Sequence, residues 1–194
     1  MNSEHSLIRP VVGLTITTAT FLLIPLIAMQ FTNEVNWTVS DFILAGFLLF
    51  GTGFSYILVT RILTAGTDRS TLYKIATGFA LFSGLFLIWS NLAVGIIGSE
   101  NQPFNMIYFG VIALGIIGAF FARFLTKGMI WVMFSMAVAQ TVTAAIALFT
   151  GLHQLPESSV AEILGVNGLF IVLFVVSGLM YRMDSMESTS NQLV

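Results

Sequence analysis

Three amide side chains lie inside long apolar segments of this 194-residue sequence, where polar groups are rare. They are Asn91, Gln140 and Asn167, and Trp89 stands two positions before the first of them. An amide in hydrocarbon must find a hydrogen-bond partner, so it marks either a contact between helices or a polar cavity. At 1.5 Å per residue, Asn91 and Asn167 each lie about 10 Å from the nearer segment end, and Gln140 lies near the middle. We interpret the four residues as a candidate polar pocket, with hydrogen-bonded helix contacts as the alternative.

Oxygen-bearing side chains form a second group, in the polar gaps between the apolar segments. Carboxylate and amide oxygens are the ligands that hard divalent cations prefer. The spacing in these gaps matches no known metal loop, however, and solvated acidic loops are the simpler interpretation. We predict no metal site and retain the group only as a candidate outer-rim site, consisting of Glu34, Asn36, Asp41, Glu100 and Asn101.

Several kinds of chemistry are excluded by what the sequence lacks. It contains no cysteine, which excludes disulfides, iron–sulfur clusters and thiol catalysis. The central part of each apolar segment carries no ionisable residue, although proton relays and most ion-coupled transport sites need one. The two histidines, His5 and His153, are expected on opposite membrane faces and therefore cannot ligate one haem together. We expect no catalytic residues and no cofactor.

Long apolar stretches set the fold class. Hydrophobic residues make up 57% of the chain and charged residues 8%, which is outside the range of soluble domains. A stretch of about 20 apolar residues is long enough to cross the hydrocarbon core as a helix. The predicted helices cover residues 11–30, 41–61 (with Ser40 as N-cap), 75–98, 106–122, 128–150 and 160–181. The sequence therefore predicts an all-α, polytopic membrane protein with a tail at residues 1–10, a six-helix domain at 11–182 and a disordered tail at 183–194.

The basic residues indicate how this bundle is oriented. All seven lie in alternate gaps, and the charged residues of the gaps between are all acidic. Basic loops remain in the cytoplasm during insertion, so both termini are predicted to be cytoplasmic. No basic cluster is dense enough for nucleic-acid binding. The basic residues are Arg9, Arg61, Arg69, Lys74, Arg123, Lys127 and Arg182.

Small residues recur at helical spacing and predict close helix packing. Two such ridges run along 128–150, at Ala137, Thr141 and Ala145 and in parallel at Ala139, Thr143 and Ala147. Shorter ridges pair Ala80 with Gly84 and Gly115 with Ala119. Small residues let helix backbones approach where lipid provides no hydrophobic drive. The partner is either another helix of this chain or a second copy.

Three stretches carry a resemblance to a known family. They are residues 28–37 (AMQFTNEVNW) followed by Asp41 and Phe42, residues 89–101 (WSNLAVGIIGSEN) followed by Asn105 and 119–123, and residues 162–168 (EILGVNG). The chain resembles an uncharacterised family of small bacterial multi-pass inner-membrane proteins with six helices. The resemblance implies a location in the bacterial inner membrane. It implies no activity, substrate or catalytic residue.

Two functional hypotheses follow from these observations. The first is a non-enzymatic structural or accessory membrane subunit, which would pack in the lipid bilayer as a homo-oligomer or in a larger complex. The second is a small channel or facilitator for a neutral or weakly polar solute, with Asn91, Gln140 and Asn167 as a hydrogen-bonding path. A path requires the three amides to converge on one axis, whereas helix contacts require each to pair locally.

Overall fold

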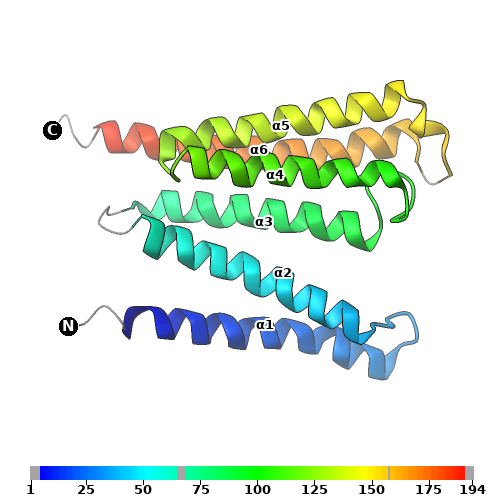
Figure 1. Ribbon diagram of the computed structural model, residues 1–194, viewed down its shortest axis with the longest axis horizontal. Coiled ribbons are helices and arrows are strands. Elements are labelled where there is room, and N and C mark those ends of the chain that lie inside the picture. Colours follow the sequence, from blue (N-terminus) through cyan, green and yellow to red (C-terminus); the bar gives the residue numbers. More distant parts are fainter. Residues whose placement is uncertain (1–4, 65–68, 157, 191–194) are drawn as a thin grey trace. The chain divides into compact units, whose positions relative to one another are not determined.

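The structure, a computed structural model, describes residues 5–64, 69–156 and 158–190 (Figure 1). These residues form helices and turns, and no strand is found among them. Six helices are long and apolar enough to cross a membrane, which confirms the predicted all-α, six-helix architecture. The elements are α1 (His5–Phe31), α2 (Val39–Ile57), η1 (Leu58–Leu63), α3 (Thr71–Ala93), η2 (Pro103–Met106), α4 (Ile107–Phe121), α5 (Thr126–Phe149), η3 (Leu152–Gln154) and α6 (Val160–Ser190).

Several helix boundaries differ from the prediction: α1 begins at His5, inside the predicted N-terminal tail, and α3 begins at Thr71. Local side chains and glycines set two others. The N-cap of α2 is Thr38 and not Ser40, since Thr38 and Asp41 form a reciprocal capping box. α3 ends at Ala93, five residues before the predicted end at residue 98. Gly95 and Gly98 adopt positive φ angles of 75° and 61°, and the chain turns there instead of continuing as a helix.

The last helix is longer than the sequence suggested. We predicted disorder from residue 183, but α6 continues as a helix to Ser190. Its last turns extend beyond the N-terminal end of α5 (Figure 1). The physical reason is Asp184, which is buried at 3% exposure and hydrogen-bonded to two other elements. The prediction of disorder is therefore wrong for residues 183–190, while residues 191–194 lie outside the described chain.

The chain divides into two compact units, Met1–Ala65 and Gly66–Val194. The first contains α1, α2 and η1. Its two long helices approach closely at Gly53, where an added Cβ would lie 2.2 Å from Leu14 Cδ1. η1 is a π-helix, and the Thr64 hydroxyl donates to the carbonyl of Val59 (2.8 Å) to close its end.

The second unit contains α3 to α6, and its largest helix contact joins α5 and α6. Buried residues on both helices alternate at intervals of four and three, the spacing of a heptad seam. The buried residues that follow this spacing are, on α5, Met129, Met133, Met136, Gln140, Thr143 and Ala147, and, on α6, Ile163, Asn167, Phe170, Phe174, Ser177, Tyr181 and Asp184; Val132, Ala137, Ala144 and Gly178 are buried beside them. Polar residues thus lie within the seam as well as apolar ones.

α3 and α4 pack onto this pair through aromatic and small residues. The rings of Phe86 on α3 and Phe170 on α6 lie 5.3 Å apart between centroids. On α4, a Cβ added at Gly115 would lie 2.5 Å from the sulfur of Met136, so α4 and α5 approach closely at this glycine. The Gly115 ridge predicted from the sequence therefore serves packing within the chain, and its second member, Ala119, is buried at 9% exposure.

Candidate functional site

Asn167 is the centre of a buried polar cluster that joins three helices. Its Oδ1 accepts hydrogen bonds from the Tyr108 hydroxyl of α4 and from Gln140 Nε2 of α5, both at 3.0 Å. Its Nδ2 donates to the carbonyl of Ile163 one turn earlier (2.8 Å). Asn167, Gln140 and Tyr108 are at most 1% exposed, so these bonds are shielded from solvent. Gln140 Oε1 is buried and has no hydrogen-bond partner.

Asn91 belongs to a second cluster, centred on Asn105 in η2. Asn91 Nδ2 donates to the carbonyl of Asn105 (3.1 Å). The side chain of Asn105 in turn holds the α3–α4 connection: its Oδ1 accepts from the N–H of Ile97, and its Nδ2 donates to the carbonyls of Ile97 and Ser99. A side chain at Gly95 would collide with this arrangement, because its Cβ would lie 2.5 Å from the Ser99 carbonyl oxygen. Asn91 Oδ1 is also buried without a partner.

The predicted pocket is thus divided between two clusters. Gln140 and Asn167 are brought together, whereas Asn91 pairs with a different element, and the bonds described above share no residue between the clusters. Trp89 is half-buried on α3. Tyr108 was missed in the sequence because it stands in the first turn of α4, where polar residues are usual.

The candidate outer-rim residues are exposed, and several serve local structure. Asp41 Oδ2 accepts from the N–H and the hydroxyl of Thr38, at 2.7 and 2.8 Å, which caps α2. Asn101 donates to its neighbour Glu100 (3.0 Å). Glu34 and Asn36 lie in the α1–α2 connection and are exposed. Among the described residues, no three histidine or acidic side chains are grouped so that they could hold a metal ion.

A third polar cluster was not predicted. It lies at the end of the second unit where α3 and α5 begin and where the basic residues of this unit are found, which we call the basic end. Asp184 of α6 accepts a short hydrogen bond from the Ser70 hydroxyl at its Oδ1 and one from the Thr126 hydroxyl at its Oδ2 (2.9 Å). Ser70 is the N-cap of α3 and Thr126 is the first residue of α5, so one carboxylate connects three helices. Arg69 Nη1 donates to Thr126 Oγ1 at 3.5 Å, and its guanidinium lies 4.7 Å from the Tyr73 ring centroid.

Two tyrosines extend this cluster to the α4–α5 turn. The Tyr73 hydroxyl donates to the carbonyl of Phe124 (2.6 Å). Phe124 and the preceding Arg123 have positive φ angles of 55° and 50°, a strained conformation for residues with side chains. The Tyr181 hydroxyl donates to Thr77 Oγ1 (3.0 Å), and its ring packs edge-on against Tyr73. The sequence signal for Asp184 is its heptad spacing from Ser177 and Tyr181, which continues beyond the apolar residues of α6.

The six apolar helices and the buried hydrogen-bonded clusters define a multi-pass α-helical membrane protein. No protein-family model, curated protein or solved structure matches the chain. The resemblance to small bacterial membrane proteins remains a prediction from the sequence.

Proposed function

We propose that this protein is a non-enzymatic structural or accessory subunit of the bacterial inner membrane, with both termini in the cytoplasm. The observation that supports this role is the local pairing of the intramembrane amides. Asn167 bonds across α4, α5 and α6, and Asn91 bonds to the α3–α4 connection. These contacts stabilise helix packing, whereas a solute path requires the three amides on one axis.

One observation favours the alternative, a small facilitator for a neutral or weakly polar solute. The carbonyl oxygens of Gln140 and Asn91 are buried without hydrogen-bond partners. Buried polar atoms are normally paired, and an ordered water satisfies many that the protein leaves open. A solute with hydroxyl or amine groups would offer the same donors.

The native mass of the protein, extracted from its own membranes in a mild detergent, separates the two roles. The accessory role predicts a mass well above that of a small homo-oligomer and the co-purification of another polypeptide. A homo-oligomer alone would leave only the structural role, in which the protein packs against copies of itself. A monomer alone would contradict both, and flux of small neutral solutes into liposomes containing the protein would then support the facilitator.

The proposed orientation has a separate test, because the chain contains no native cysteine. Single cysteines at Glu100 and Glu187 should react with an impermeant maleimide from opposite faces of the membrane, Glu187 from the cytoplasmic one. Reaction of both from the same face would contradict the proposed orientation.

A further inference from the structure

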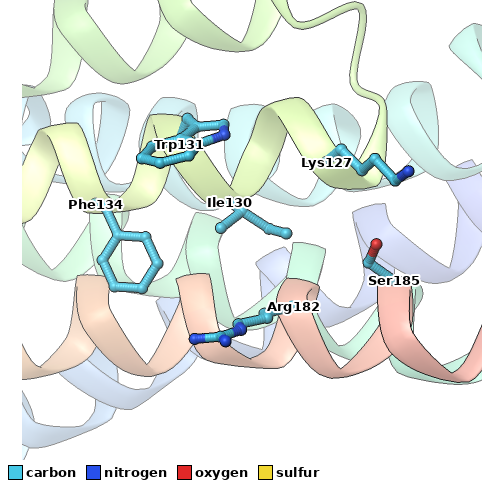
Figure 2. A pocket seen from close by; sticks show the side chains of 6 residues that line it. All are labelled: Lys127, Ile130, Trp131, Phe134, Arg182 and Ser185. Atoms are coloured by element: carbon cyan, nitrogen blue, oxygen red, sulfur yellow. The ribbon is translucent and has the colours of Figure 1, made fainter.

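A groove between α5 and α6 lies at the basic end of the second unit. Its volume is about 360 Å³, and it is lined by Lys127, Ile130, Trp131, Phe134, Arg182 and Ser185. The first four belong to α5 and the last two to α6 (Figure 2). The wall on α5 is therefore mainly apolar, and a cation stands on each helix.

The two cations are available to a ligand. Both Lys127 and Arg182 are exposed, and within the described parts of the chain neither forms a hydrogen bond or an ion pair. They extend in opposite directions along the groove, Arg182 toward Phe134 and Lys127 past Ser185 (Figure 2). Positive charge is thus spread along the groove, which suits an extended anionic group better than a single small ion.

The apolar wall identifies the rest of the ligand. Trp131 is 74% exposed and lies near the first turn of a membrane-spanning helix, the depth at which tryptophan meets lipid headgroups. An inorganic anion would pair with the cations but leave this surface uncovered. A phospholipid covers both, since a glycerol backbone joins its phosphate to its acyl chains.

We propose that the groove binds one anionic phospholipid from the leaflet at the basic end of the helices. Arg182 pairs with the phosphate, Lys127 and Ser185 contact the outer part of the headgroup, and an acyl chain lies against Trp131 and Phe134. Basic pockets between membrane-spanning helices are known to bind anionic headgroups in this way. The proposal is independent of the accessory role proposed above.

Trp131 itself provides the probe. The variant Trp37→Phe, Trp89→Phe retains Trp131 as its single tryptophan. Two vesicle samples are compared, one with phosphatidylglycerol and one with an equal mole fraction of phosphatidylcholine, each brominated at the same acyl-chain carbons near the headgroup. The brominated phosphatidylglycerol should quench the fluorescence of Trp131 more than the brominated phosphatidylcholine. Replacing Lys127 or Arg182 by Gln in this background should lower the relative affinity for the anionic lipid about fivefold each, the factor for one cation near an anionic surface.

Arg123→Gln is the matched control, because it removes an exposed cation from the adjacent α4–α5 turn without altering the groove. It should leave the quenching ratio unchanged, and circular dichroism checks the fold of each variant. Equal quenching by the two lipids, or a ratio that survives Lys127→Gln with Arg182→Gln, would overturn the proposal. So would an equal loss in Arg123→Gln, which indicates general surface attraction, or relief of quenching by inorganic phosphate, which indicates a plain anion site. If the double variant does not fold, the two single variants make the same comparison.

Discussion

Replacement of Asp184 by alanine should destabilise the second unit substantially. The side chain is buried and accepts one hydrogen bond at each carboxylate oxygen, from Ser70 and from Thr126. A hydrogen bond to a charged group is worth about 1.5–3 kcal/mol, and the change leaves two hydroxyls without an acceptor. Both hydroxyls are only partly buried, so water compensates for some of the loss. We expect the free energy of unfolding to fall by about 2–4 kcal/mol.

The assay is denaturant unfolding of the purified protein in detergent, followed by circular dichroism. Glu187→Ala is the matched control, since it removes an exposed carboxylate one turn later on the same helix and should change the free energy by less than about 0.5 kcal/mol. Combining Asp184→Ala with Thr126→Val should cost less than the sum of the two single changes, because both remove the same bond. If Asp184→Ala is no more destabilising than Glu187→Ala, Asp184 does not connect the three helices and the extension of α6 needs another explanation.

Three further changes test the remaining contacts by the same unfolding assay. Asn167→Leu leaves Tyr108 and Gln140 without their acceptor and should lower the free energy of unfolding by about 1–3 kcal/mol. Adding Tyr108→Phe should then recover part of the loss, and no recovery would contradict the bond. Gly128→Ala places a Cβ 2.6 Å from that of Ala122 and 3.1 Å from its Cα, and should cost about 1–3 kcal/mol. Gly165→Ala, which meets nothing within 4 Å, should be neutral or stabilising, and equal effects of the two alanines would refute the packing argument. Tyr73→Phe removes the bond to the strained Phe124 turn and should cost about 1 kcal/mol, so an unchanged stability would show that the turn holds without it.

The number and approximate positions of the helices could be predicted because membrane crossing depends on length and apolarity alone. Local chemistry sets the ends of the helices more finely: Thr38 is the N-cap of α2, and α3 ends just before Gly95, which has a positive φ angle. Neither effect changes the hydrophobic pattern, so an apolar run does not reveal it. The residue count also predicted similar membrane depths for Asn91 and Asn167. Equal depth does not bring two side chains together, because the position of a residue on a helix also depends on its direction around the helix axis.

The direction around the helix axis decides which amides meet. Asn167 lies on the heptad seam of α6 and faces Gln140 on the seam of α5, while Asn91 reaches Asn105 on η2. Seam membership could have been obtained from the spacing of four and three residues, had the polar positions been included in the pattern. Among the polar residues of the seam, Gln140, Asn167 and Asp184 form hydrogen bonds between helices.

The polar residues of the α6 seam also explain how this helix keeps one register. A seam made only of apolar residues allows a helix to slide by one repeat at modest cost, whereas a polar residue at a fixed level specifies the pairing. Asn167 fixes α6 against α4 and α5 near one end, and Asp184 fixes it against α3 and α5 near the other. Sliding by one turn would break the hydrogen bonds at both levels together and leave the groups buried and unpaired. The α3–α6 unit is therefore held in one arrangement at both ends of α6, which suits a protein that serves by packing more than one that works by moving these helices past each other.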